Sequence, residues 1–145
     1  MKERYSRQSL SAEYTGRMKG GRGAVREARE RILVVDDDHG ILDSFDAMFG
    51  EEYPLVLMDR GRDAQKKLSE ESFGLLFLDI KMPDLNGLEL LRWIQARNLE
   101  TKVVIITALP QASYEEIAHQ CGAFRYVKKP FDVDELEDIA RIVLH

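Results

Sequence analysis

The sequence has a single cysteine, Cys121, and no apolar run longer than four residues. One cysteine excludes an internal disulfide and a cysteine-rich zinc site. Runs of four residues are far too short to cross a bilayer as a helix. The first residues are basic, but no apolar segment follows them as it would in a secretory signal. These absences favour a protein without a membrane anchor, and we expect a cytoplasmic location.

The charged residues divide the chain into two parts. Through Arg31 the sequence contains 9 Lys and Arg against 4 Asp and Glu, and from Ile32 onward it contains 12 against 22. Residues 1 to about 24 also lack apolar periodicity and include the glycine-rich stretch GRMKGGRG, which is typical of a flexible segment, and AVREARER after them could form a short helix that leads into the first strand. We therefore expect a basic, flexible N-terminal arm over residues 1–30 and one folded domain over residues 31–145. The arm is interpreted as a disordered tail, with a nucleic-acid or partner contact as the alternative.

Short apolar runs alternate with segments of helical length. Because these runs are continuous rather than alternating, they predict strands that are buried on both faces of a parallel sheet, with helices covering both faces. Candidate helix starts are Asp84 or Asn86 before Gly87, Pro110, and Asp132 or Asp134. The five segments are Ile32–Val35, Tyr53–Met58 (interrupted by Pro54), Phe73–Leu78 (interrupted by Gly74), Val103–Ile106 and Phe124–Val127 (interrupted by Arg125).

Chemically active residues follow four of the five predicted strands. Ligands of open α/β sheets bind beyond the carboxyl ends of the strands, so these residues are expected to converge on one edge. Clustered carboxylates suit a hard cation such as Mg²⁺, which also offsets their mutual repulsion. A lysine and a hydroxyl beside them suit a transferring phosphoryl group. The residues are Asp36 and Asp37 after the first strand, Asp79 after the third, Thr107 at the end of the fourth and Lys129 after the fifth; Asp38 is expected to cap a helix or to face solvent.

Four motifs give the sequence a specific resemblance. VVDDD, LLFLDIKMPDLNGLELL, VVIITA and CGAFRYVKKPF occur in this order. Together they resemble the receiver domain of two-component response regulators over residues 31 to 144. The resemblance implies a flavodoxin-like, doubly wound parallel sheet of five strands in the order 2-1-3-4-5, with helices on both faces.

The resemblance also implies a phosphoacceptor and a metal site. Asp79 matches the family's phosphoacceptor, a carboxylate nucleophile. Asp37 matches the direct Mg²⁺ ligand, and Asp36 matches the partner that acts mostly through water. The backbone carbonyl of Lys81 corresponds to the third ligand, and Mn²⁺ is an alternative ion.

Three further residues match the family's switch. Thr107 corresponds to the hydroxyl residue that moves toward the phosphoryl group. Lys129, in a Lys-Pro pair that is commonly cis in this family, corresponds to the lysine that pairs with the acceptor carboxylate and phosphoryl oxygens. Tyr126 corresponds to the aromatic side chain that turns inward when the threonine moves. From the residues alone, Thr107 and Tyr126 also fit ordinary strand packing, and Lys129 fits a surface lysine.

The implied function is a phosphorylation-dependent signalling switch. A histidine kinase or a phosphotransfer protein of a phosphorelay would donate phosphate to Asp79. The surface of the fourth helix, fifth strand and fifth helix would then change and regulate a target protein or an output domain. A homodimer that forms on phosphorylation is a further option. We expect no separate enzymatic turnover beyond self-phosphorylation and slow autodephosphorylation, and no membrane or nucleic-acid contact through the receiver domain itself.

Two alternative functions come from other classes. A Mg²⁺-dependent phosphohydrolase that resembles the haloacid dehalogenases would also use an aspartyl phosphate, but Lys81 occupies the position of its second aspartate. A binding module without phosphorylation would leave the chemical positions unused, although all of them are filled here.

Overall fold

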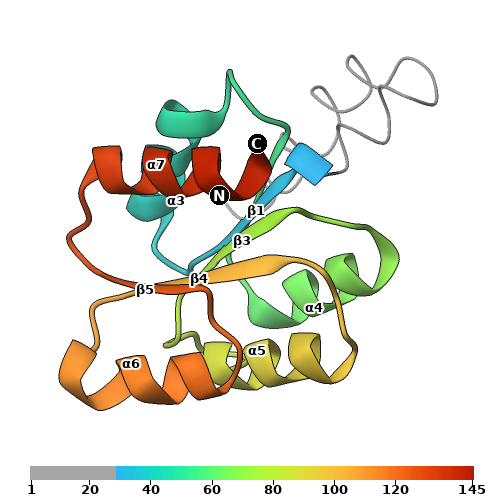
Figure 1. The fold of residues 1–145 in the computed structure, drawn as a ribbon, viewed down its shortest axis with the longest axis vertical. Helices are drawn as coiled ribbons and strands as arrows, with labels where there is room; N and C mark the ends of the chain where they lie inside the picture. The colour runs from blue at the N-terminus through green and yellow to red at the C-terminus, as the bar shows by residue number, and fades with distance from the viewer. Residues whose placement is uncertain (1–28) are drawn as a thin grey trace.

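The computed structural model describes residues 29–145, so the predicted arm, apart from its last two residues, lies outside the described part. Within that part the strands and helices alternate along the chain (Figure 1). The strands are β1 (Ile32–Val35), β2 (Leu55–Met58), β3 (Leu75–Leu78), β4 (Lys102–Thr107) and β5 (Arg125–Lys128). The helices are α3 (His39–Phe49), α4 (Gly61–Glu70), α5 (Gly87–Ala96), α6 (Gln111–Gln120) and α7 (Val133–Leu144).

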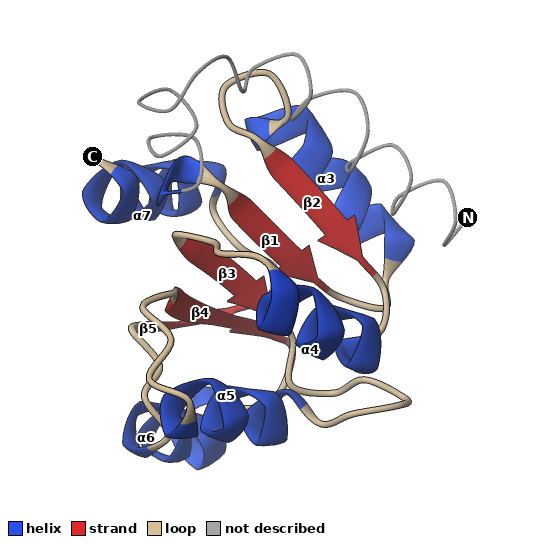
Figure 2. Cartoon of the chain, turned by 90° about the vertical axis from the view of Figure 1, so that its right-hand side faces the viewer, coloured by secondary structure: helices blue, strands red, loops and turns tan. Residues whose placement is uncertain are grey.

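The five strands form one parallel sheet in the order β2-β1-β3-β4-β5, which confirms the predicted topology (Figure 2). The pairing register of the strands determines which residues are neighbours at the carboxyl edge of the sheet. Val35 lies opposite Leu78, so the next residues, Asp36 and Asp79, extend side by side from neighbouring strands. At the same edge, between the ends of β4 and β5, the N–H group of Lys129 donates to the carbonyl of Thr107 at 2.8 Å.

The sheet is buried on both faces. Leu33 and Val35 pack with residues of α4, α5 and α6, whereas Ile32 and Val34 pack with residues of α3 and α7. Figure 1 shows the same division, with α3 and α7 on one side of the strands and the other three helices opposite. Each large apolar side chain that is removed from water in this way stabilises the fold by about 1.5–3 kcal/mol. None of the helices among residues 29–145 is long and apolar enough to cross a membrane.

The structure shows which of the candidate residues at the helix starts act as N-caps. Asn86 caps α5, Asp132 caps α7, and Asp38 caps α3 by accepting from the N–H groups of Gly40 and Ile41. Asp84, in contrast, caps no helix that follows it. Its carboxylate accepts hydrogen bonds at the start of α4, more than twenty residues earlier in the chain.

Candidate metal and phosphoacceptor site

Three carboxylates meet at the carboxyl edge of the sheet. Asp36 and Asp37 follow β1, Asp79 follows β3, and one oxygen from each lies within 4.8 Å of the others. Asp36 and Asp79 are buried, while Asp37 is exposed. Like charges this close together disfavour the ionised state of one another. The three residues predicted from the sequence are therefore brought together in an arrangement that a cation would stabilise.

Asp36 has the strongest electrostatic perturbation of the site. Burial raises the pKa of its carboxyl group from 3.8 to about 6, and the neighbouring charge of Asp79 adds to this effect. The ammonium of Lys129 and the backbone N–H of Asp38, which donates to Asp36 Oδ1 at 2.9 Å, act in the opposite direction. Ionisation of Asp36 in the folded protein thus costs free energy, and a bound cation would offset this cost.

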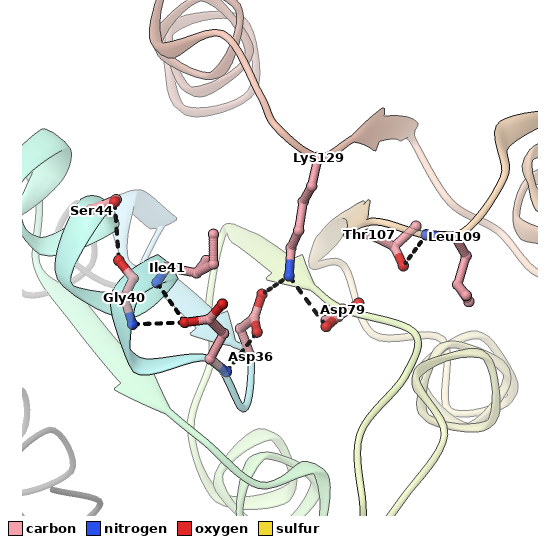
Figure 3. A network of polar contacts seen from close by, with 9 residues as sticks. Asp36, Gly40, Ile41, Ser44, Asp79, Thr107, Leu109 and Lys129 are labelled. Carbon is pink, nitrogen blue, oxygen red and sulfur yellow. Dashed lines mark hydrogen bonds and ion pairs between the residues drawn. The ribbon is translucent and has the colours of Figure 1, made fainter.

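Lys129 lies between two carboxylates (Figure 3). Its Nζ is 2.7 Å from Asp36 Oδ2 and 3.4 Å from Asp79 Oδ2. The sequence predicted the pairing with Asp79, but the shorter ion pair is with Asp36. Burial by itself lowers the pKa of Lys129, yet the two carboxylates outweigh it, and the pKa lies above its usual value. Lys129 therefore carries its charge at neutral pH. The peptide bond between Lys129 and Pro130 is cis.

Thr107 and Tyr126 contact the same residue, Leu109, in the loop after β4. The Thr107 hydroxyl oxygen accepts a hydrogen bond from the Leu109 N–H at 3.2 Å, and the Tyr126 hydroxyl donates to the Leu109 carbonyl at 2.9 Å. Both side chains are buried. Burial also raises the pKa of the Tyr126 hydroxyl. The ring of Tyr126 is thus buried, with its hydroxyl bonded to the loop after β4.

A cleft of about 420 Å³ opens over these groups. It brings the predicted residues of four different strand ends to one concave surface. Asp36 and Tyr126 lie outside its lining, whereas the exposed Lys81 belongs to it. The lining consists of Asp37, Asp38, Asp79, Lys81, Met82, Pro83, Thr107, Ala108, Leu109 and Lys129.

The donor set fits a hard divalent cation. Mg²⁺ binds carboxylate and carbonyl oxygens and keeps several waters, which needs a site that is open on one side. The three carboxylates supply such oxygens, and the partly open cleft leaves room for water and a phosphoryl group. No cysteine or histidine belongs to this cluster, so the softer donors that zinc favours are not part of it.

Gly87 was not predicted from the sequence as part of the site. A Cβ atom at this position would lie 2.2 Å from the carbonyl oxygen of Asp79 and 2.8 Å from the Cα of Ile80. The N–H of Gly87 also donates to the Ile80 carbonyl at 2.8 Å. Glycine therefore allows α5 to begin against the backbone of Asp79. The only sequence signal for this approach is a glycine that directly follows the cap residue Asn86.

Residues 32–141 match the model of the response regulator receiver domain. The chain belongs to this family. Receiver domains are the phosphorylation-dependent switches of two-component response regulators, and the resemblance noted in the sequence is thereby confirmed.

Relatives and solved structures agree with this assignment. Sporulation initiation phosphotransferase F of Bacillus subtilis is 31% identical over 113 residues, which cover 77% of this chain and 91% of that protein. The transcriptional regulatory protein CrdR of Helicobacter pylori is 37% identical over 111 residues, 75% of this chain. The solution structure of the beryllofluoride-activated NtrC4 receiver domain dimer matches with a TM-score of 0.74 at 30% identity, covering 79% of this chain and 96% of that one. The chain spans 52% of the length of CrdR.

Proposed function

We propose that Asp79 accepts a phosphoryl group from a phosphohistidine of a histidine kinase or a phosphotransfer protein. A carboxylate oxygen of Asp79 attacks phosphorus, the P–O bond forms, the P–N bond breaks, and the imidazole leaves with the electron pair. The observation that carries this proposal is the position of Asp79, which lines a cleft open to a donor and lies 3.4 Å from a lysine ammonium. The product is an aspartyl phosphate, and no separate substrate is turned over.

Mg²⁺ would be held by Asp36, Asp37, Asp79 and the backbone carbonyl of Lys81, with Mn²⁺ as an alternative. When bound, the ion neutralises charge on the transferring phosphoryl oxygens. Lys129 contributes a second positive charge beside Asp79, and the Thr107 hydroxyl offers a hydrogen bond. Asp36 keeps Lys129 near the acceptor through their 2.7 Å ion pair.

The output is a change in the surface formed by α6, β5 and α7. A phosphoryl group on Asp79 would draw Thr107 toward it and break the hydrogen bond between the Thr107 hydroxyl and the Leu109 N–H. The Leu109 carbonyl also accepts from the Tyr126 hydroxyl, so the movement would reach the side chain of Tyr126 on β5. Of residues 29–145, the exposed large apolar side chains all lie on the two helices beside this strand; they are Ile117, Val133 and Ile142.

This surface would contact a target protein, an output domain or a second copy of the chain. The similarity to a phosphotransferase, to a transcriptional regulator and to a receiver dimer supports all three kinds of partner. We place this switch in the cytoplasm, and we assign it no membrane partner and no nucleic-acid contact through the receiver domain. Residues 1–30 are proposed as a separate basic arm, and residues 31–145 as the receiver.

Acetyl phosphate with Mg²⁺ tests the proposal, with intact mass as the readout. Wild type should gain one phosphoryl group, whereas Asp79→Asn and wild type in EDTA should gain none. A mass gain that survives Asp79→Asn would contradict the proposal. Multiple turnover of a phosphate ester would instead favour the phosphohydrolase alternative.

A further inference from the structure

Helix α4 begins without a cap of its own. Its N-cap residue, Arg60, has extended backbone angles but makes no side-chain hydrogen bond to the helix. The carboxylate of Asp84 serves instead: its two oxygens accept from the N–H groups of Gly61 and Arg62, each at 2.9 Å. An ionised carboxylate at a helix N-terminus satisfies backbone donors and interacts favourably with the helix dipole.

The loop that carries Asp84 also packs tightly against the start of α4. Gly61 is buried, and a Cβ atom there would lie 2.8 Å from Leu85 Cβ and 3.3 Å from Met82 Cε. Burial by itself raises the pKa of Asp84, but the N–H groups of Arg62 and Gly61 outweigh it, so the pKa is lowered. The Asp84 carboxylate is therefore ionised and accepts two hydrogen bonds, in a closely packed contact between its loop and the start of α4.

The Asp84 contact involves the same loop that carries Asp79. Asp84 belongs to the connection between β3 and α5, which also contains Asp79 and Lys81. The connection before α4 is tied on its other side to the first residue of α3, because His39 Nε2 and Asp59 Oδ2 are 2.8 Å apart. The residues around the start of α4 thus link the first turn of α3, which follows the loop of Asp36 and Asp37, to the loop that carries Asp79, although they line no part of the cleft.

We infer that Asp84 is a positioning residue for the metal site: by anchoring the β3–α5 loop to the N-terminus of α4, it keeps Asp79 and the Lys81 carbonyl in place opposite Asp37. This inference rests on the proposed function, because it concerns the affinity of the same site for Mg²⁺. Partners that orient metal ligands from outside the first coordination shell typically change metal affinity about 10- to 100-fold when they are removed.

The test separates the anchoring of the loop from the capping of the helix. Asp84→Ala removes both. In the double variant Arg60→Asp/Asp84→Ala, α4 receives a local cap at a position with suitable extended angles, but the loop stays detached. Lys66→Gly weakens the exposed face of α4 without touching the loop and serves as a control for helix stability. Mg²⁺ binding is measured by calorimetry, unfolding by urea, and protection of the backbone amides of residues 80–86 by hydrogen exchange.

We expect Asp84→Ala to bind Mg²⁺ about tenfold more weakly, with faster exchange in residues 80–86. The double variant should regain stability but not Mg²⁺ affinity, and Lys66→Gly should keep wild-type affinity. Asp84→Asn, which retains one acceptor oxygen, should be intermediate and provides the comparison if Asp84→Ala does not fold. Unchanged affinity in Asp84→Ala, or full recovery in the double variant, would overturn the inference. A wild-type protein that binds no Mg²⁺ would overturn the proposed function together with it.

Discussion

The buried carboxylate of Asp36 should make the metal-free protein less stable as the pH rises. In the folded protein its pKa is about 6, against 3.8 as the reference value. The folded state therefore binds more protons than the unfolded state between these values, and the stabilisation present below the lower pKa is lost as the pH rises through the upper one. The full difference corresponds to about 3 kcal/mol.

Asp36→Asn removes this titration and keeps the shape of the side chain. Relative to wild type, its free energy of unfolding should increase by about 1.4 kcal/mol between about pH 5 and about pH 7.5. Urea unfolding in EDTA at the two pH values measures this change. The ion pair to Lys129 forms only when Asp36 is ionised, and its effect is already contained in the folded-state pKa of about 6, so its loss adds no separate pH-dependent difference. A difference between the two proteins that does not vary with pH would refute the assigned pKa.

Three other substitutions or additions have distinct expected effects. Gly87→Ala should destabilise the protein by about 3 kcal/mol or more in urea unfolding and abolish the adduct with acetyl phosphate, because its Cβ would overlap the Asp79 backbone; a stable, active variant would contradict this reasoning. Tyr126→Phe should cost about 1 kcal/mol through loss of the hydrogen bond to Leu109, with the phosphoryl adduct retained in the intact mass. Mg²⁺ at about 100 times its dissociation constant should stabilise wild type by about 2.7 kcal/mol in urea unfolding at neutral pH, and much less in Asp37→Asn; equal stabilisation of both proteins would place the ion elsewhere.

The strands were predictable because their sequence pattern reflects burial on both faces. Three predicted strands nevertheless began too early, the last of them by one residue at Phe124 and the other two by two residues. Tyr53 and Phe73 are buried like the residues that follow them, but they precede the first paired residues, Leu55 and Leu75. Apolar character reports burial, whereas a strand also requires backbone pairing, so the pattern alone could not place these two boundaries.

The residues at the strand ends were predictable for a related reason. In a parallel sheet, the register brings the residues after each strand to one edge, so the convergence of Asp36, Asp79 and Lys129 followed from the order of elements. Contacts that depend on the path of the loops could not be predicted. Asp84 caps a helix that precedes it in the chain, and Lys129 lies nearer to Asp36 than to Asp79. Both facts require the relative positions of separate connections, on which local sequence carries no information.

The site of phosphorylation can be measured directly by borohydride reduction. Wild type is treated with acetyl phosphate and Mg²⁺, the acyl phosphate is reduced to the alcohol, and peptide masses then locate the homoserine that replaces an aspartate. We expect homoserine at position 79 alone, and none when Mg²⁺ is chelated. Homoserine at position 36 or 37, or no reduction product despite a mass gain in the intact protein, would contradict the assignment of Asp79 as the phosphoacceptor.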